Sequence, residues 1–221
     1  MRGLSVRFVV AVVLASIGAL CLVVPAAENA GYRRGVVVAE REFAAWVDDG
    51  LFAYLVAENE RLFRTGQAEL VDAFAYEQPS GDLARFGLVD DRIGFVRAPT
   101  AGIDLPVYLG ANRPNLARGA VHLTQTSYPV GGPDTNAVIA AHRGGTLTMF
   151  RNIHRLAIGD EVTFTGPGGR LAYRVVETAI IAPDDVGRVR IQPGRDLLTL
   201  VSCHPLGRNE QRYVVYAERV L

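Results

Sequence analysis

Three residues of types suited to acyl transfer stand at the ends of apolar stretches. His142 closes NAVIAAH, Cys203 closes DLLTLVSC, and Arg212 opens RYVVYAERV. A thiol attacks as its thiolate, so a nucleophilic cysteine needs a base or a cation close by. A histidine can move the proton, and a fixed guanidinium can hold a carbonyl and stabilise an oxyanion. If the fold joins them, they predict cysteine-based nucleophilic catalysis.

Each of these residues also has an ordinary structural interpretation. A free cysteine is often a small buried hydrophobe, so cysteine counting alone leaves both roles open for Cys203. An arginine on a strand is commonly a solvated charge at the edge of a sheet. The positions of His142 and Cys203 are far apart in the chain, so only the fold can bring them together.

The remaining histidines are expected to play lesser roles. His122 lies in a short strand-like segment and is expected to be structural or to line the site. His154 is expected to be solvated. His204 follows Cys203 directly and should face the opposite side of its strand. The histidines and cysteines show no spacing typical of a zinc site, so no metal and no other cofactor is expected.

The elements that must position these residues are mostly strands. Seven short β-type segments separated by Gly- and Pro-rich turns follow Arg92, and their spacing predicts a closed barrel or sandwich. One helical stretch is expected from Thr148 to Leu156. The segments are IGFVRAP, DLPVYLG, NAVIAAH, EVTFTG, LAYRVVETAIIAP, DLLTLVSC and RYVVYAERV.

The N-terminus reads as a membrane anchor. Residues 8–27 are uncharged and apolar, which suits a helix that spans a bilayer. Arg2 and Arg7 precede the run, so the positive-inside rule predicts a cytoplasmic N-terminus and an extracellular catalytic domain. A cleaved signal peptide is the alternative, with small residues at Val24-Pro25-Ala26-Ala27. The organisation expected is a cytoplasmic stub at 1–7, an anchor at 8–27, a membrane-proximal helix and lid-like segment at 28–91, and the catalytic domain at 92–221.

If the chain is exported, the number and position of its cysteines bear on the role of Cys203. Cys21 lies in the apolar run and is expected to be a passive residue of the membrane core, which leaves Cys203 without an intramolecular partner. Exported thiols are normally paired, so a lone one calls for a specific role. Residues 36–63 repeat apolar positions at helical spacing and predict one amphipathic helix, with Gly50 as a possible break. Residues 65–91 predict an irregular covering segment.

Composition excludes one class of partner. Basic and acidic residues both number 23, so the formal charge is zero and no basic excess exists to neutralise a phosphate backbone. We therefore expect no nucleic acid partner.

Three motifs resemble the signature of the sortase family. Residues 199–203, TLVSC, are similar to Thr-Leu-x-Thr-Cys, with Ser202 keeping the hydroxyl of the second threonine. Residues 209–212, NEQR, resemble the Asn-x-x-Arg motif that ends in the catalytic arginine. Residues 140–144, AAHRG, resemble the catalytic His-Arg-Gly segment, and residues 126–132 match its usual lead-in. The resemblance covers about residues 92–220 and implies a mainly β, eight-stranded sortase-type closed barrel with an N-terminal helix and short connecting helices.

The resemblance also implies a reaction. Cys203 would attack the Thr–Gly carbonyl of a Leu-Pro-x-Thr-Gly-like (LPxTG) sorting signal to give a thioester, which an amine resolves. His142 would act as general acid and then base, and Arg212 would position the signal and stabilise the oxyanion. The implied partners are LPxTG-type surface proteins or pilins as acyl donors and a pilin lysine or cell-wall peptide amine as acceptor.

The segment before the barrel indicates a subclass. Pilin-polymerising class C sortases carry a lid with an Asp-Pro-aromatic motif, and Asp72-Ala73-Phe74 falls at a comparable place with alanine for proline. We expect Asp72, Phe74, Ser202 and His122 to form the lid or the substrate groove. Against class C, no second apolar membrane segment follows the barrel. The alternatives are a cell-wall-anchoring sortase of another class, a secreted cysteine peptidase in which water resolves the thioester, and a barrel binding module with a structural Cys203.

Overall fold

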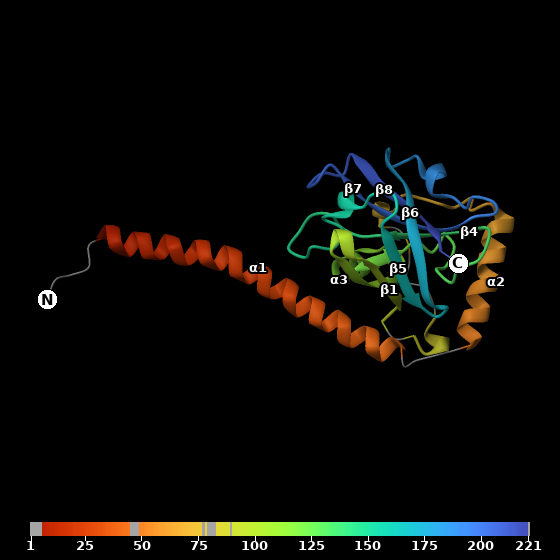
Figure 1. Ribbon diagram of the computed structural model, residues 1–221, viewed down its shortest axis with the longest axis horizontal. Helices are drawn as coiled ribbons and strands as arrows, with labels where there is room; N and C mark the ends of the chain where they lie inside the picture. Colours follow the sequence, from red (N-terminus) through yellow and green to blue (C-terminus); the bar gives the residue numbers. More distant parts are fainter. Residues whose placement is uncertain (1–5, 45–48, 77, 79–82, 89, 221) are drawn as a thin grey trace.

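The protein consists of a long helix that leads into a β-barrel (Figure 1). The computed structural model describes residues 6–44, 49–76, 78, 83–88 and 90–220. Helix α1 (Val6–Ala44) extends well beyond the barrel at its N-terminal half, while α2 (Asp49–Thr65) packs against the opposite side of the barrel. Within the described residues, one helix is long and apolar enough to cross a membrane, and it is α1.

Eight strands close into a barrel, which confirms the predicted fold class. Their order around the barrel is β1-β2-β3-β4-β7-β8-β6-β5. Two neighbouring pairs are parallel, β2 with β3 and β4 with β7, and the other pairs are antiparallel. The strands are β1 (Arg92–Ala98), β2 (Ile103–Leu109), β3 (Ala120–His122), β4 (Thr135–Ala140), β5 (Glu161–Gly166), β6 (Gly169–Ile181), β7 (Asp196–His204) and β8 (Gln211–Arg219).

Short helices occupy several of the connections. Helix α3 (Arg113–Arg118) joins β2 to β3, with Asn112 as its N-cap: its side chain accepts a hydrogen bond from Asn115 N. The others are single 3₁₀ turns, which is the form that short connecting helices commonly take. These turns are η1 (Ala73–Ala75), η2 (Ala84–Phe86), η3 (Pro99–Ala101), η4 (Ile153–Arg155) and η5 (Val186–Val189).

Strands β4 and β7 are buried on both faces. Leu198 and Leu200 of β7 belong to the barrel core, whereas Val201 and Cys203 pack in a second apolar cluster on the outer face. Residues 70–76, which we call the covering segment, supply part of that second cluster. A strand that would otherwise face water on one side is therefore covered on both, as the unbroken apolar run of DLLTLVSC requires.

The N-terminal helix differs from the expectation. The predicted anchor and the first part of the predicted helix over residues 36–63 form one continuous helix of 39 residues, α1. Residues 45–48 of that prediction lie outside the described residues, and helix α2 begins at Asp49, next to the possible break at Gly50. The helix continues through Pro25, although proline removes a backbone donor from a helix interior.

The predicted helix from Thr148 to Leu156 is wrong. The segment forms successive turns and the single turn η4. The backbone N–H of Phe150 donates to His142 O instead of to the carbonyl four residues before it, and the carbonyl of Thr146 is occupied by the side chain of Asn29. Beyond Phe150 the backbone hydrogen bonds join residues three apart, as in turns: Arg151 N donates to Thr148 O, and Leu156 N donates to Ile153 O.

Candidate active site

Strand register brings the three candidate catalytic residues to one end of the barrel. Cys203 on β7 lies directly opposite Arg212 on the antiparallel strand β8. Strands β4 and β7 run parallel, with Ala140 paired to Val201, and His142 and Cys203 each lie two residues further on. The pairing of neighbouring strands thus supplies a juxtaposition that the separation in sequence conceals.

The same three residues share the outer face of the barrel. Successive strand residues point to opposite faces, so residues two apart point to the same one. The outer cluster beneath the covering segment contains residues of three strands: Val201 of β7, Val138 and Ala140 of β4, and Val214 and Tyr216 of β8. Cys203, His142 and Arg212 each stand two residues from a member of this cluster on the same strand or its extension, so they point to the same face. The candidate site therefore opens toward residues 70–76.

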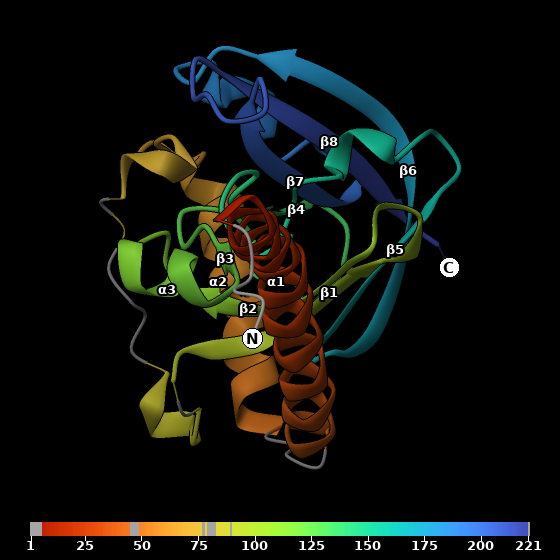
Figure 2. The same ribbon diagram turned by 90° about the vertical axis from the view of Figure 1, so that its left-hand side faces the viewer.

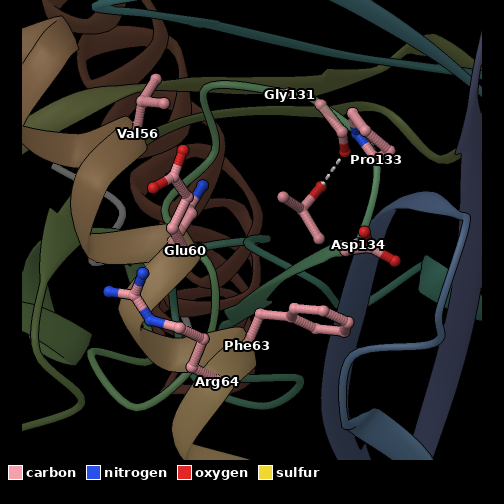
Figure 3. A pocket seen from close by; sticks show the side chains of 10 residues that line it. Val56, Glu60, Phe63, Arg64, Gly131, Pro133 and Asp134 are labelled. Carbon is pink, nitrogen blue, oxygen red and sulfur yellow. Dashed lines mark hydrogen bonds between the residues drawn. The ribbon is translucent and has the colours of Figure 1, made fainter.

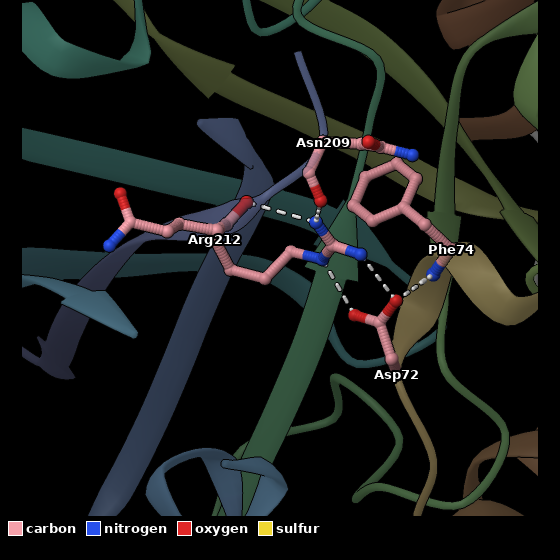
Figure 4. A network of polar contacts seen from close by, with 5 residues as sticks. Asp72, Phe74, Asn209 and Arg212 are labelled. Carbon is pink, nitrogen blue, oxygen red and sulfur yellow. Dashed lines mark hydrogen bonds and ion pairs between the residues drawn. The ribbon is translucent and has the colours of Figure 1, made fainter. Parts of the chain in front are cut away.

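The guanidinium of Arg212 is fixed from two sides (Figure 4). Its Nη1 donates to the carbonyls of Asn209 and Gln211, at 2.8 and 2.9 Å, within the NEQR turn itself. Its Nε and Nη2 donate to the two carboxylate oxygens of Asp72, each at 2.7 Å. Only 7% of the Arg212 side chain and 19% of the Asp72 side chain is exposed, so this is a largely buried, bidentate ion pair.

Aromatic rings complete the cover. The Phe74 ring lies 5.0 Å from the Arg212 guanidinium carbon and 6.0 Å from the His142 ring, and the Tyr76 ring lies 6.5 Å from His142. Asp72 also accepts a hydrogen bond from Phe74 N at 3.2 Å, which caps η1. One carboxylate therefore both binds the arginine and shapes the turn that carries the ring.

Glutamines flank the covering segment on both sides. Gln67 donates to Gln125 O and accepts from Ile191 N, at 3.1 and 2.7 Å. Gln78 accepts from Thr124 N at 2.9 Å and donates to the side chain of Gln125 at 3.0 Å. Both glutamines are buried. The segment is thus fastened to the barrel at either end, and between these points it is held over the site by the contacts of Asp72, Phe74 and Tyr76.

The closed arrangement favours the neutral forms of Cys203 and His142. Burial raises the pKa of the Cys203 thiol, and Asp72 raises it further, while Arg212 and Arg143 act in the opposite direction. Burial lowers the pKa of His142. Both shifts disfavour the thiolate and the imidazolium. With Asp72 in place, the site therefore holds its nucleophile in the less reactive thiol form.

Two neighbours brace the strand ends. Ser202 is fully buried and its hydroxyl donates to Ala141 O at 2.7 Å, which ties β7 to the residue before His142. Arg143 is buried beside Tyr213 and donates to Cys203 O at 3.5 Å and to His204 Nδ1 at 2.8 Å. Ser202 therefore faces away from the outer surface and contributes by holding the backbone.

The other histidines lie apart from the reactive face. His122 has no exposed surface, and its Nε2 lies 2.9 Å from Ser127 O. Burial lowers its pKa to about 4. This placement favours the structural role rather than a place in the groove. His154 is exposed, and His204 contacts Arg143.

Tyr76 and Arg143 are the residues that sequence reasoning missed. Tyr76 stands two residues beyond the expected Asp-x-aromatic pattern and adopts a left-handed backbone, with φ of 59°. The alternation of Phe74 and Tyr76 in AFAYE was the available signal. Arg143 was visible only as part of AAHRG, because its partners on β7 are distant in sequence.

A separate cavity of about 410 Å³ lies at the other end of β4 (Figure 3). Helix α2 forms one wall and the loop from Gly131 to Asp134 forms the other; the α2 residues are Val56, Glu60, Phe63 and Arg64. Thr135, the first residue of β4, lines the cavity, whereas His142 comes after the last residue of β4. This cavity is therefore distinct from the candidate active site.

The comparisons with known proteins identify the family. The sequence profile of the Sortase domain matches residues 96–220, which includes every strand from β2 onward and the last three residues of β1. The chain belongs to the sortase family, a family of cysteine transpeptidases.

Individual relatives agree with this assignment. Sortase D of Bacillus subtilis (strain 168) is 30% identical over 132 residues, 58% of this chain and 63% of that protein. Sortase C1 of the group B Streptococcus (GBS) Pilus Island 1 is 32% identical with a TM-score of 0.75, covering 85% of this chain and 98% of that one. Sortase C-1 from Actinomyces oris is 32% identical with a TM-score of 0.67, covering 78% and 99%. The structural similarity thus extends beyond the barrel into the segments that precede it.

Proposed function

We propose that this protein is a class C sortase that cleaves an LPxTG-like sorting signal between Thr and Gly and joins the released protein to a pilin lysine. The observation that carries the subclass is the Asp72 carboxylate on the donor edge of Arg212, with Phe74 over the guanidinium. The similar streptococcal protein is Sortase C1 of Pilus Island 1, a name that agrees with this subclass.

In the first half-reaction the Cys203 thiolate attacks the threonine carbonyl carbon. The C–S bond forms and the C–N bond to glycine breaks, with the proton of His142 passing to the leaving amine. In the second half-reaction the acceptor amine attacks the thioester, the C–N bond forms, and the C–S bond breaks. His142 takes the proton from the incoming amine, so thiolate and imidazolium are regenerated.

Arg212 would stabilise both tetrahedral intermediates. Its Nη1 is held by the backbone of its own turn, so the guanidinium plane is set before substrate binds. The Nε and Nη2 donors then face the space that Asp72 occupies. A carbonyl that becomes an oxyanion would replace the carboxylate at those donors. The covering segment would therefore act as a lid that must move before acylation.

Two other activities remain as competing outcomes. A cell-wall-anchoring sortase would pass the same thioester to a cell-wall peptide amine. A cysteine peptidase would pass it to water. The apolar half of α1 supports a membrane-bound enzyme, and the basic flank at Arg2 and Arg7 supports an extracellular barrel.

The decisive experiment traps the acyl-enzyme. We expect the purified chain, incubated with LPxTG peptides, to gain the mass of the acyl fragment at Cys203, and a pilin-derived lysine peptide to convert it to an amide-linked product. Cys203→Ala should lose both signals, whereas Cys21→Ala serves as the matched control and should keep them. Release of free acid unchanged by added amine would instead indicate a peptidase.

A further inference from the structure

The side chain of Asn29 connects the anchor helix to the loop that follows His142. Its Nδ2 donates to Pro25 O at 2.7 Å and to Thr146 O at 3.1 Å. Its Oδ1 accepts from the backbone N–H and the hydroxyl of Thr148, at 3.1 and 3.2 Å. The amide therefore uses both its donor group and its acceptor to join α1 to the Thr146–Thr148 loop.

That contact lies at the level of the membrane surface if the apolar run spans the bilayer. Residues 8–27 would extend about 30 Å as a helix, the thickness of the hydrocarbon core. Asn29 is two residues further along α1, roughly 3 Å beyond the core. The headgroup layer is roughly 5–7 Å deep on each side. The loop bound by Asn29 would then lie within headgroup depth.

A second element meets α1 one turn later. Tyr32 donates its hydroxyl proton to Arg118 O at 2.7 Å, which places the end of α3 beside the helix. The loop between β7 and β8 also extends toward the side from which α1 projects, as Figures 1 and 2 both show. Within it Leu206 is 53% exposed. The end of the barrel that carries Cys203 is therefore the end turned toward the apolar half of α1.

Two of these segments, α3 and the loop after His142, carry arginines and no carboxylates, whereas Arg208 of the β7–β8 loop pairs with Glu210, and Glu28 precedes Asn29 on α1. No Asp or Glu occurs between Asp104 and Asp134, which includes α3, nor between Asp134 and Asp160, which includes the loop after His142. Arg113 and Arg155 are exposed in these two stretches. Arg155 belongs to η4, which packs on η3, and η3 adjoins Gly102, whose carbonyl accepts a hydrogen bond from Arg33 of α1.

We infer that this end of the barrel docks on the lipid surface, with residues 113–118, 144–148 and 205–208 as a membrane-side face that binds anionic phospholipid headgroups. Asn29 is the positioning residue that sets the face at headgroup depth. An arginine near an anionic surface shifts such a docking equilibrium about fivefold, equivalent to about 1 kcal/mol. An exposed leucine adds apolar area at the same level. The candidate active site would then open beside the membrane, not away from it.

The inference rests on insertion of the apolar run, so the test uses the full chain in phospholipid nanodiscs and first measures its incorporation. A fluorophore is placed at Thr146→Cys, at Leu206→Cys or, as the distant control, at Arg170→Cys, each in a Cys21→Ala/Cys203→Ala background. The quencher is a lipid with a nitroxide on its headgroup. We expect strong quenching at positions 146 and 206 and little at 170, and stronger quenching in discs that contain phosphatidylglycerol.

Charge variants sharpen the test. With the label at position 146, Arg113→Gln/Arg208→Gln removes two exposed arginines of this face and should lower quenching in anionic discs toward the level in neutral discs. The matched pair Arg64→Gln/Arg170→Gln removes two exposed arginines from α2 and β6 and should change nothing. Equal quenching at 146, 206 and 170, or a chain that does not incorporate, would overturn the inference. Equal quenching in discs with and without phosphatidylglycerol would overturn the proposed recognition of anionic headgroups.

Discussion

The strand ends and the covering segment hold parts of the same site by different means. Cys203 and Arg212 are opposite each other in a continuous ladder between β7 and β8, with β4 on the other side of β7. Residues 70–76 have no ladder and are held by one ion pair, two aromatic rings and the glutamines at either end. Regular backbone pairing gives permanent geometry, whereas a few side-chain contacts give an arrangement that can be released.

The largest expected effect is on the transpeptidation rate, and it tests Arg212, which the β7–β8 ladder holds in place. Arg212→Lys should lower transpeptidation about as much as Arg212→Ala, on the order of 10²–10³-fold for a lost oxyanion donor. A lysine cannot bind the carbonyls of Asn209 and Gln211 while presenting two further donors in one plane. Steady-state kinetics with a sorting peptide measures this. Retention of most of the rate by the lysine variant would show that charge alone suffices.

The next effect concerns the stability of the barrel itself. The pKa of His122 is about 4 in the folded protein against 6.5 ordinarily, so the unfolded chain binds the proton first as pH falls. Stability should therefore be complete above pH 6.5 and fall between 6.5 and 4, by on the order of 3 kcal/mol. Urea denaturation across this range measures the loss. His154→Gln, at an exposed histidine, should keep the same acid dependence; a flat profile in the wild type would contradict the prediction.

A smaller effect tests the releasable part. Asp72→Ala/Phe74→Ala removes charge-assisted hydrogen bonds worth about 1.5–3 kcal/mol and should accelerate alkylation of Cys203 roughly tenfold or more. Loss of the Asp72 charge should also lower the pKa of Cys203, because that carboxylate disfavours the thiolate. The alkylation rate should thus rise at lower pH than in the wild type. Unchanged rates and pH profile would mean that residues 70–76 do not restrict the thiol.

The smallest effect restores the missing proline. Ala73 is the first residue of η1, and Asp72 before it has ψ of 136°, a conformation that a following proline favours. Ala73→Pro should stabilise the closed segment by about 0.4–1 kcal/mol and slow alkylation of Cys203 by a few-fold at most. Faster alkylation would show that the ring does not fit beside its buried neighbours.

The sequence predicted the parts of this site that depend on strand pattern. Cys203 ends one predicted strand and Arg212 opens the next, and the register of β7 with β8 pairs these two residues directly. The barrel was predictable because short β-type segments alternate with Gly- and Pro-rich turns. The position of His142 came from its motif, since a parallel pairing of β4 with β7 leaves no local signal.

The parts that failed depend on long-range side-chain contacts. The stretch from Thr148 to Leu156 forms turns, and N–H groups at its start are held by Asn29 and His142, which no local pattern reveals. The continuous α1 was missed because the anchor and the amphipathic segment were considered separately. Arg143 acts on a carbonyl of β7, so its role required the fold.

The position of β8 between β6 and β7 has a consequence for how the chain folds. The barrel stays open along that seam until β8 inserts, and Arg212 arrives on the same strand. Strands β7 and β8 follow each other through residues 205–210, so their pairing is local, whereas the pairing of β8 with β6 closes a longer loop and costs more entropy. Cys203 and Arg212 therefore come opposite each other in a local hairpin. The guanidinium would thus stand beside the thiol before the barrel closes.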